Sequence, residues 1–444
     1  MANTFVQAMN LIATLSKRHY FGFIRGHKYI DQKTINKIQP YVVQEDQDMV
    51  LEYERKFAAL IGSGQAIAYA AARMGFYDLM RVIGLKRGDE VILLGSTCSV
   101  MVNAVLRVGA TPVYSEIDPN TLGSCALSIA RLITARTKMI VAQHSFGVPC
   151  DIYSISEISK KNNIFLLEDC ALTLGSKINN VVVGNFGDAA LFSTDHSKPI
   201  NTITGGFIYT KNIILSTRLR SSQQSCCELS IARKKALWAR FLFERKYCDI
   251  KNYSTFKILE IVNSIMKKLH MTEGDFLSDD NGLVCVGSYP YPAKLPTFIA
   301  AIGLMEIERW QFTANERSGV LKLLMDVLLE CNLNAALPKA YSNNLIEIIP
   351  LRLAWCDATN GKLKESMKFF LDISQFWFMR PIVSTKINLK MLGYRTGSCP
   401  ISEYIGNNII NLPCNISVDD ANVLANLIRK GMHEKNVSKK LAGN

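Results

Sequence analysis

Residues 164–171, IFLLEDCA, decide the fold class, because four apolar residues are followed directly by two carboxylates. A short run that is apolar throughout is typical of a strand covered on both faces. Polar side chains directly after such a strand lie at the carboxyl edge of a parallel sheet, where ligands gather. Glu168 and Asp169 are therefore candidates for a binding site.

Apolar runs and helical patterns alternate along the chain before this stretch. The expected strands are residues 91–94, 112–114, 139–143 and 164–167, and the expected helices are residues 99–108, 127–134 and 152–162. Strands that alternate with helices predict a mainly parallel sheet with helices on both faces. The chain is therefore predicted to be an α/β protein.

Polar residues also follow two other apolar runs. Gln143-His144-Ser145 follow residues 139–142, and Ser193 through Lys198 follow the run 189–192. Beyond Thr210 the pattern changes. We expect helices over much of 213–280, at 298–310 and at 318–329, then an apolar run at 346–353.

Length and composition exclude several classes of protein. The 444 residues are 48% hydrophobic and 20% charged, which predicts two or three globular domains rather than a disordered, collagenous or coiled-coil chain. No apolar window reaches the roughly 18 residues that a membrane span needs. The apolar segment Ala8 to Leu15 is short, and its positive charges follow it, unlike those of a signal peptide. We therefore expect a cytoplasmic protein.

The cysteines are scattered, and no metal site is expected. Of twelve cysteines, Cys226 and Cys227 are neighbours, and no C-x-x-C pair occurs. The six histidines lack metal-ligand spacing. Free thiols in a reducing compartment are the favoured interpretation.

The net charge of +13 is concentrated between Arg218 and Lys268, where twelve basic residues face four acidic ones. A nucleic-acid partner is disfavoured, because no recognition motif accompanies the charge. A solvated helical face, an anionic membrane surface and an anionic substrate remain open. The apolar residues in this segment, among them Trp238, Phe241 and Phe256, predict packing on the protein or peripheral membrane contact, with packing favoured.

Three residues suggest a cofactor. A pyridoxal phosphate site requires an acid beside the pyridine nitrogen, a lysine able to bond the cofactor, and a hydroxyl for its phosphate. Asp169, Lys198 and Ser193 supply these groups at the ends of two neighbouring apolar runs. A carboxylate at a strand end also often caps a helix, so Asp169 alone is a weak signal.

A longer series of motifs resembles a known family. The order and spacing resemble those of the pyridoxal-phosphate-dependent, fold type I sugar aminotransferases of the DegT/DnrJ/EryC1/StrS group, from about Phe57 to Leu427. The matching motifs are Gly88 to Ile92, Val108 to Val113, Ile117 to Pro119, Arg136 to Lys138, Glu168 to Ala171, Val183 to Asp188, Ser193 with Lys198, Gly205-Gly206, and Cys399-Pro400 through Leu412-Pro413.

The resemblance implies a domain organisation and a function. It implies an N-terminal arm (1–50), a three-layer fold type I domain (51–314) with a basic helical insertion at about 218–290, and a smaller C-terminal α+β domain (315–444). It implies an aminotransferase that moves an amino group, from glutamate, to a nucleotide-linked keto sugar for lipopolysaccharide or another surface polysaccharide. It also implies a homodimer. The alternative is a binding or scaffold protein that keeps the fold with altered catalysis.

Residue roles follow from the same resemblance. Lys198 corresponds to the lysine that bonds the cofactor and carries the proton, Asp169 to the partner of the ring nitrogen, and Ser193 to a phosphate ligand. Lys198 also argues against the branch of the family that has histidine there and removes a hydroxyl.

The chain departs from the family pattern at several cofactor contacts. Ala71-Ala72-Arg73 replace Ser-Gly-Thr, with Ala72 and Arg73 expected at the phosphate. Cys98 replaces the aromatic residue that stacks on the ring, and Leu172 replaces a glutamine.

Two histidines have no settled role in the sequence. His144 stands where the family has a histidine, but a satisfied core histidine is equally expected. His196 matches no family position, because the family's usual histidine aligns with Asp195.

Overall fold

A computed structural model describes residues 19–268, 289–333, 336–357, 362–382 and 388–441. Among these residues, seven strands form the central sheet: β1 (Gln65–Tyr69), β2 (Glu90–Leu94), β3 (Thr111–Ser115), β4 (Thr137–Gln143), β5 (Phe165–Asp169), β8 (Ala189–Ser193) and β9 (Gly206–Thr210). Their order is β1-β9-β8-β5-β4-β2-β3. β9 runs antiparallel to β1 and β8, whereas the other neighbours are parallel. The predicted mainly parallel sheet is confirmed.

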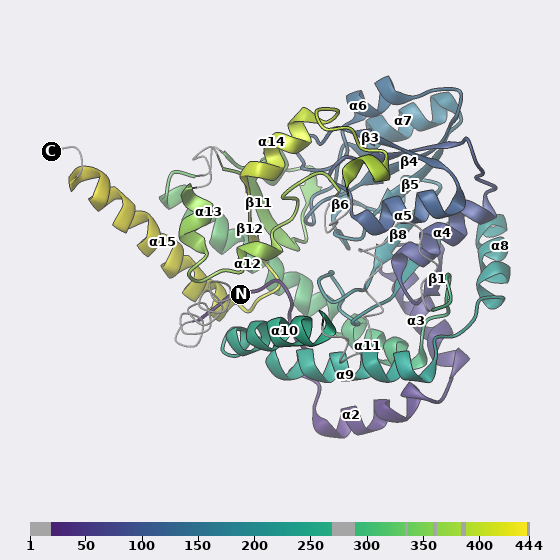
Figure 1. Ribbon diagram of the computed structural model, residues 1–444, viewed down its shortest axis with the longest axis horizontal. Helices are drawn as coiled ribbons and strands as arrows, with labels where there is room; N and C mark the ends of the chain where they lie inside the picture. Colours follow the sequence, from purple (N-terminus) through teal and green to yellow (C-terminus); the bar gives the residue numbers. More distant parts are fainter. Residues whose placement is uncertain (1–18, 269–288, 334–335, 358–361, 383–387, 442–444) are drawn as a thin grey trace.

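Helices enclose this sheet (Figure 1). They are α3 (Gln47–Ala59), α4 (Ala72–Val82), α5 (Ser99–Val108), α6 (Ala126–Leu132), α7 (Ile152–Asn162), α8 (Ile213–Gln224) and α11 (Thr297–Glu308). α4 packs against α5 and α8, and α6 packs against α7. Every residue of β2 and β9 is buried, as expected for strands covered on both faces. The three-layer α/β fold expected from the sequence is therefore confirmed.

The sequence located most of these elements within a few residues. The helices expected at 99–108 and 152–162 coincide with α5 and α7. The apolar run at 346–353 divides into β10 (Ile346–Glu347) and the start of β11 (Arg352–Cys356). Pro350 lies between the two strands, and a proline has no N–H to continue a ladder.

The C-terminal part of the chain has its own sheet and core. β11 pairs antiparallel with β12 (Ile409–Pro413), and α12 (Trp310–Glu330) packs against α15 (Val418–Leu441). The helix expected at 318–329 is part of α12, so the expected domain boundary at 314/315 falls inside a helix. α13 (Lys362–Met367) and α14 (Pro400–Asn408) complete this part.

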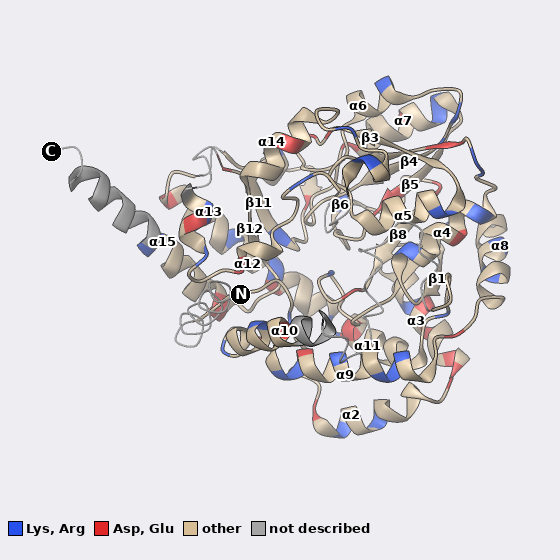
Figure 2. Ribbon diagram, in the orientation of Figure 1, with Lys and Arg blue, Asp and Glu red and all other residues tan. Residues whose placement is uncertain are grey.

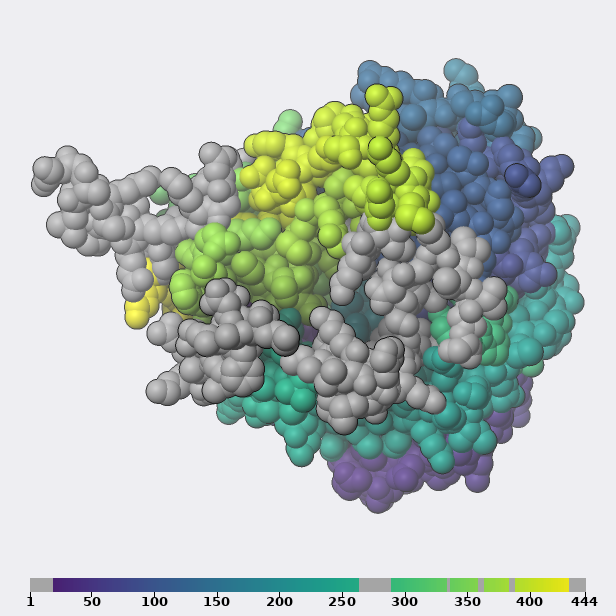
Figure 3. All heavy atoms as spheres, viewed as in Figure 1, coloured from purple at the N-terminus to yellow at the C-terminus, as the bar shows by residue number. Residues whose placement is uncertain are grey.

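This C-terminal part lies directly against the large sheet domain. Figure 3 shows the yellow-green surface of the α14 region in contact with the blue surface of the earlier chain. The backbone N–H groups of Ile401 and Ser402 donate to the Glu116 carboxylate at 3.0 and 2.9 Å. A short sheet of β6 (Lys177–Ile178), β7 (Val181–Val182) and β10 also joins the two parts.

Several described residues of the expected N-terminal arm are buried in the cores. Phe21 and Phe23 are buried in the C-terminal core, and the Phe21 N–H donates to the Phe370 carbonyl at 2.8 Å. The chain then forms α2 (Gln32–Ile38), whose Ile35 and Ile38 join the main core. The segment therefore connects both parts of the protein.

The basic segment forms helices that pack on the protein. α8, α9 (Ile231–Tyr247) and α10 (Tyr253–Lys268) cover most of it. Trp238, Phe241 and Phe256 are at most 8% exposed and lie in hydrophobic clusters. Burial of this apolar stripe supports the packing interpretation over membrane contact. In the described ranges, no helix is both long and apolar enough to cross a membrane.

Part of the positive charge of this segment is also paired with acidic residues of the protein. α9 carries one acidic residue, Glu244, among its basic residues, which Figure 2 shows in blue. Lys234 is 3% exposed and pairs with Glu45 and Glu228. The interpretation of the basic residues as one solvated face is therefore wrong for Lys234, whose charge is neutralised inside the fold.

Candidate active site

One cavity of about 350 Å³ brings the sequence-predicted residues together. It lies at the carboxyl ends of β5 and β8, beside the first residues of α4 and α5. The predicted residues that line it are Ala71, Ala72, Arg73, Cys98, Asp169, Leu172, Ser193 and Lys198. Ala71 and Lys198, which are more than 120 residues apart in the chain, therefore meet at the sheet edge that the strand pattern indicated.

Strand pairing explains how Asp169 and Ser193 meet. Asp169 ends β5 and Ser193 ends β8, and these strands are parallel neighbours with Asp169 opposite Leu191. Lys198 follows in the loop that leads back to β9, where its backbone N–H donates to the Asp195 carbonyl at 3.0 Å. The loop is closed by the Thr194 N–H, which donates to the Gly205 carbonyl at 3.1 Å.

The first turn of α4 forms one wall of the cavity. Its N-cap Ala71 has an extended backbone and no side-chain cap. The first N–H groups of a helix have no partner within the helix, and the positive end of the helix dipole favours an anion. A phosphate fits this position without the hydroxyls that the family usually places there.

A glycine allows α4 to lie this close to the sheet. A Cβ on Gly206 would lie 2.5 Å from Ala72 Cα and 2.6 Å from the Phe192 carbonyl oxygen. Any larger residue would therefore displace the start of α4 from the end of β8. The neighbouring Gly205 has a φ of +123°, a conformation that other residues rarely adopt.

Asp169 has the electrostatics expected of a partner for a cation. The residue is 5% exposed, and its Oδ1 accepts the Ala171 N–H at 3.0 Å. Burial raises the pKa of this carboxyl, although the Ala171 N–H and the charges of Lys198 and His144 act in the opposite direction. A buried carboxylate is stabilised by a cation beside it, and a protonated pyridine nitrogen supplies one. The residues present therefore fit pyridoxal phosphate.

Lys198 is held in a setting that favours its neutral amine. Burial lowers its pKa, and the acidic groups nearby, first among them Asp195, offset this only in part. Its Nζ lies 4.5 Å from the centre of the Trp377 ring. The Arg352 guanidinium stacks on the same ring at 3.8 Å. A neutral amine is the form that attacks a carbonyl, and the lowered pKa increases the fraction of Lys198 in that form.

An ion network beside Lys198 extends the cavity wall to the basic segment. His196 lies 3.3 Å from Asp195 and 3.1 Å from Glu244. Arg240 bridges Glu244 and Glu260 at 2.5 and 2.6 Å. Arg240 and Glu260 line the cavity, so α9 and α10 contribute directly to it.

Opposite charges determine the ionisation of this network. Burial alone would raise the pKa of Glu244, but His196 and Arg240 outweigh it and hold this pKa at about 2. Burial would likewise lower the pKa of His196, but Asp195 and Glu244 raise it. Glu244 is therefore a carboxylate at neutral pH, and the raised pKa of His196 favours its charged form.

Sequence reasoning missed several residues of the cavity wall. Trp377 and Phe378 come from the C-terminal part, and no local motif marks them. Arg240 and Glu244 are four residues apart in a helical pattern, a spacing that signals an ion pair. That signal was present in the sequence, but the position of the pair at the cavity was not.

His144 is a satisfied core histidine and does not line the cavity. Its Nε2 lies 3.2 Å from Glu168 Oε2, and its Nδ1 accepts the Cys150 N–H at 3.0 Å. The ligand atoms of His144, Glu168 and Cys170 lie within 4.8 Å of one another. The Glu168 oxygens already accept the backbone N–H groups of Gly184, Phe186 and Gly187. These hydrogen bonds explain the cluster as a brace for the 184–187 loop, without an ion.

The geometry of the cavity defines a class of enzyme. It combines a buried aspartate at the end of one strand, a lysine in the loop after the neighbouring strand, and a helix N-terminus beside a serine. That class is the fold type I pyridoxal-phosphate-dependent transferases. The chain belongs to the DegT/DnrJ/EryC1/StrS aminotransferase family, whose model matches residues 31–427. Members of this family depend on pyridoxal phosphate, so the resemblance and the cofactor expected from the sequence are confirmed.

Individual relatives match parts of the chain. A GDP-perosamine synthase from Escherichia coli O157:H7 is 35% identical over 169 residues, which are 38% of this chain and 46% of the relative. A dTDP-3-amino-3,6-dideoxy-alpha-D-galactopyranose transaminase from Aneurinibacillus thermoaerophilus is 35% identical over 204 residues, which are 43% and 56% of the two chains. The chain thus matches about half the length of these curated relatives.

Solved structures match over nearly the full length. An aminotransferase from Psychrobacter cryohalolentis superposes with a TM-score of 0.67 and 18% identity, covering 91% of this chain and 97% of that one. PseC, a Helicobacter pylori aminotransferase involved in pseudoaminic acid biosynthesis, superposes with a TM-score of 0.66 and 18% identity. The match covers 94% of this chain and 100% of that one. At this level of identity the likeness establishes the fold.

Proposed function

We propose that the protein is an aminotransferase that moves an amino group from an amino acid, glutamate, to a nucleotide-linked keto sugar. The observation that carries the proposal is the meeting of Asp169, Lys198 and Ser193 with the start of α4 in one cavity. Relatives named as enzymes that make GDP- and dTDP-linked amino sugars support the substrate class. The product would enter lipopolysaccharide or another surface polysaccharide.

Each residue has a part in this chemistry. When bound, pyridoxal phosphate supplies an electron sink for the carbanion formed at the donor. Asp169 would keep the ring nitrogen protonated, and Ser193 and the first amides of α4 would hold the phosphate. Lys198 would hold the cofactor through its Nζ, and once the donor's amine had displaced it, the freed Nζ would carry the proton that leaves the donor carbon.

The test follows the first half of the reaction in the purified protein. L-Glutamate should remove the absorbance band of the lysine-bound cofactor, and mass spectrometry with a panel of nucleotide keto sugars should then detect the aminated product. Lys198→Ala should abolish both changes, whereas Lys211→Ala, at an exposed lysine after β9, should leave them intact. Borohydride reduction should fix the cofactor on Lys198, and a label on another lysine would refute the assignment.

A homodimer is part of the same proposal. Family members build the site at a junction of two subunits, so we expect a dimer with a large interface. Light scattering measures the mass in solution. A strictly monomeric species that still transfers the amino group would contradict this part of the proposal.

A further inference from the structure

A charged pair, Arg240 and Glu260, lies on the wall of the active-site cavity and comes from the basic segment rather than from the motifs shared with the family. Arg240 belongs to α9 and Glu260 to α10, and these two helices pack side by side (Figure 1). Both residues line the cavity that also contains Asp169 and Lys198. The basic segment therefore brings polar groups of its own to the site of the proposed reaction.

Packing around the pair holds it in place. The rings of Phe243 in α9 and Phe256 in α10 lie with their centres 5.3 Å apart, and the Arg240 guanidinium lies 5.5 Å from the centre of the Phe256 ring. Lys257 of α10 donates to the Asp372 carboxylate at 2.7 Å, which ties this helix to the C-terminal part of the chain. The two helices therefore position the pair before any ligand arrives, which lowers the entropic cost of binding.

Contacts within the protein leave part of the hydrogen-bonding capacity of the pair unused. Arg240 donates through Nε to Glu244 Oε1 at 2.5 Å and through Nη1 to Glu260 Oε1 at 2.6 Å. In the described part of the chain, Arg240 Nη2 and Glu260 Oε2 make no hydrogen bond. The side chains of Arg240 and Glu260 are 19% and 34% exposed. The pair thus keeps a donor group and an acceptor oxygen for a ligand.

The charges around the pair disfavour an anionic ligand. Two carboxylates, those of Glu244 and Glu260, contact the single guanidinium of Arg240. His196, which lies 3.1 Å from Glu244, balances the second carboxylate. A phosphate or carboxylate gains little from a group whose charge is already balanced. A hydroxyl can donate to the carboxylate and accept from the guanidinium, so the pair is suited to a neutral ligand with several hydroxyl groups.

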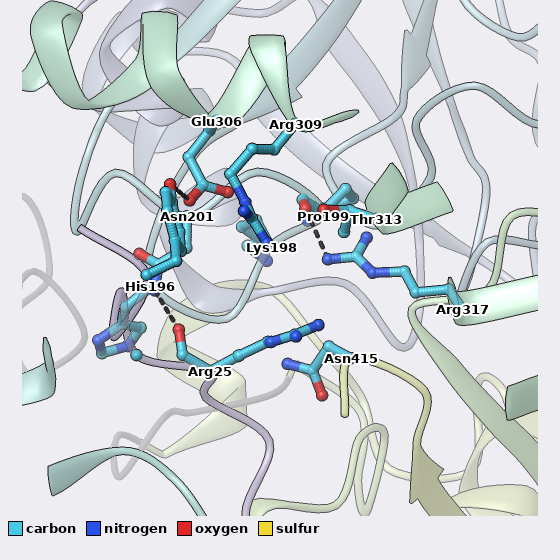
Figure 4. Close-up of a pocket in the computed structure, with 12 residues that line it drawn as sticks. Arg25, His196, Lys198, Pro199, Asn201, Glu306, Arg309, Thr313, Arg317 and Asn415 are labelled. Carbon is cyan, nitrogen blue, oxygen red and sulfur yellow. Dashed lines mark hydrogen bonds between the residues drawn. The ribbon is translucent and has the colours of Figure 1, made fainter. Parts of the chain in front are cut away.

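The size of the cavity decides where such a ligand can lie. A volume of about 350 Å³ is within the range of small-molecule sites, roughly 300 to 1,000 Å³. A neighbouring cavity, drawn in Figure 4, shares His196 and Lys198 with the first but measures about 40 Å³, enough for about three waters. A hexose is too large for this second cavity, so a sugar that reaches Lys198 has to lie in the first.

We propose that Arg240 and Glu260 bind hydroxyl groups of the hexose in the nucleotide keto sugar and thereby help to determine which sugar is accepted. The proposal rests on the proposed function, which supplies the sugar. Glu260 Oε2 accepts a hydroxyl proton, and Arg240 Nη2 donates to a hydroxyl oxygen. A sugar with a methyl group in place of that hydroxyl leaves the charged pair without a partner and binds less tightly.

Titration calorimetry of the cofactor-loaded protein tests this contact apart from turnover. The probes are GDP-mannose, dTDP-glucose and UDP-N-acetylglucosamine, which have no ketone to aminate, and each is compared with its nucleoside diphosphate, which lacks the hexose. For the nucleotide hexose that the wild type binds best, Glu260→Ala should raise the dissociation constant at least tenfold. The dissociation constant of the matching nucleoside diphosphate should stay within twofold.

Two further variants complete the experiment. Arg240→Lys keeps the positive charge but removes Nη2, and it should weaken binding of the same nucleotide hexose. Glu330→Ala removes an exposed glutamate that pairs with Arg429 outside the cavity, and it should bind like the wild type. Thermal unfolding monitors each variant, and if Arg240→Lys does not fold, the partly exposed Glu260 position decides.

Three results would overturn the proposal. Unchanged binding of the nucleotide hexose by Glu260→Ala would exclude the contact. An equal loss for the nucleotide hexose and its nucleoside diphosphate would show that Glu260 acts on the nucleotide or on the fold instead of the hexose. Wild-type protein that binds none of the three nucleotide hexoses would have no hexose site to assign.

This proposal and the proposed function fail separately. Binding of a hexose that depends on Glu260, without amination of any keto sugar, defeats the proposed function alone. Amination of a keto sugar by a protein whose binding of the hexose does not depend on Glu260 defeats this proposal alone.

Discussion

Glu244→Gln tests whether the ion network on α9 stabilises the fold beside the active site. Glu244 is fully buried and lies between His196 and Arg240, at 3.1 and 2.5 Å. Glutamine keeps the shape of the side chain but removes the charge. The variant therefore leaves two cations facing a neutral group.

The pKa of Glu244 sets the magnitude. This pKa is about 2 in the folded protein, against an ordinary value of 4.5 for a glutamate. A difference of this size corresponds to about 3 kcal/mol of stability at pH 7. Because the folded pKa is depressed, the contribution is present above pH 4.5 and is lost as the pH falls toward 2. At pH 3 about 1 kcal/mol remains.

Unfolding in urea at pH 7 and at successively lower pH measures this contribution. We expect Glu244→Gln to be less stable than the wild type by about 3 kcal/mol at pH 7, with the gap narrowing as the pH falls. Glu260→Gln is the matched control, because Glu260 also pairs with Arg240 but its side chain is 34% exposed. Its effect should stay below about 1 kcal/mol. Equal stability of the Glu244 variant at pH 7, or a gap independent of pH, would refute the reasoning.

Three further predictions concern the cofactor and the substrate. Asp169→Asn should keep the fold, weaken cofactor binding and lower turnover, as absorbance titration and kinetics would show; full activity would place the ring-nitrogen role elsewhere. Gly206→Ala should displace the start of α4, because the added Cβ would lie 2.5 Å from Ala72 Cα. The dissociation constant of the cofactor should then rise at least tenfold. An unchanged affinity for the cofactor would contradict the assignment of the phosphate site to the start of α4. Charge reversal at the exposed Lys235 and Lys246 should raise the Michaelis constant for the sugar nucleotide and reduce the salt dependence of that constant. The glutamate half-reaction should be unchanged. An unaltered Michaelis constant would argue against electrostatic attraction of the substrate by these lysines.

The sequence predicted the part of the site that depends on local pattern. Asp169 and Ser193 directly end apolar runs, and the carboxyl ends of parallel neighbours must lie side by side. Lys198 follows Ser193 by five residues, which keeps it at the same edge. The direction of the strands and the number of residues between these side chains are enough to predict their placement.

Other features depend on long-range packing that no local pattern records. Lys234 looks like one more surface charge on α9, but Glu45, 189 residues earlier, lies beside it and neutralises it. Trp377 lines the cavity because the C-terminal part folds back over Lys198. Neither contact follows from periodicity, because each joins segments whose separation in the chain exceeds 170 residues.

The departures from the family pattern and the basic segment meet at one cavity. Cys98 and Leu172 are smaller or less polar than the residues usual at their positions, and Ala71 and Ala72 contribute no hydroxyl. Arg240 and Glu260, brought by α9 and α10, add charge to the same wall. Asp169 and Lys198, to which the proposed function assigns the ring-nitrogen contact and the proton transfer, are unchanged from the pattern. Because the altered residues surround this pair without replacing it, the alterations bear on which substrate the cavity accepts more than on the transfer of the amino group.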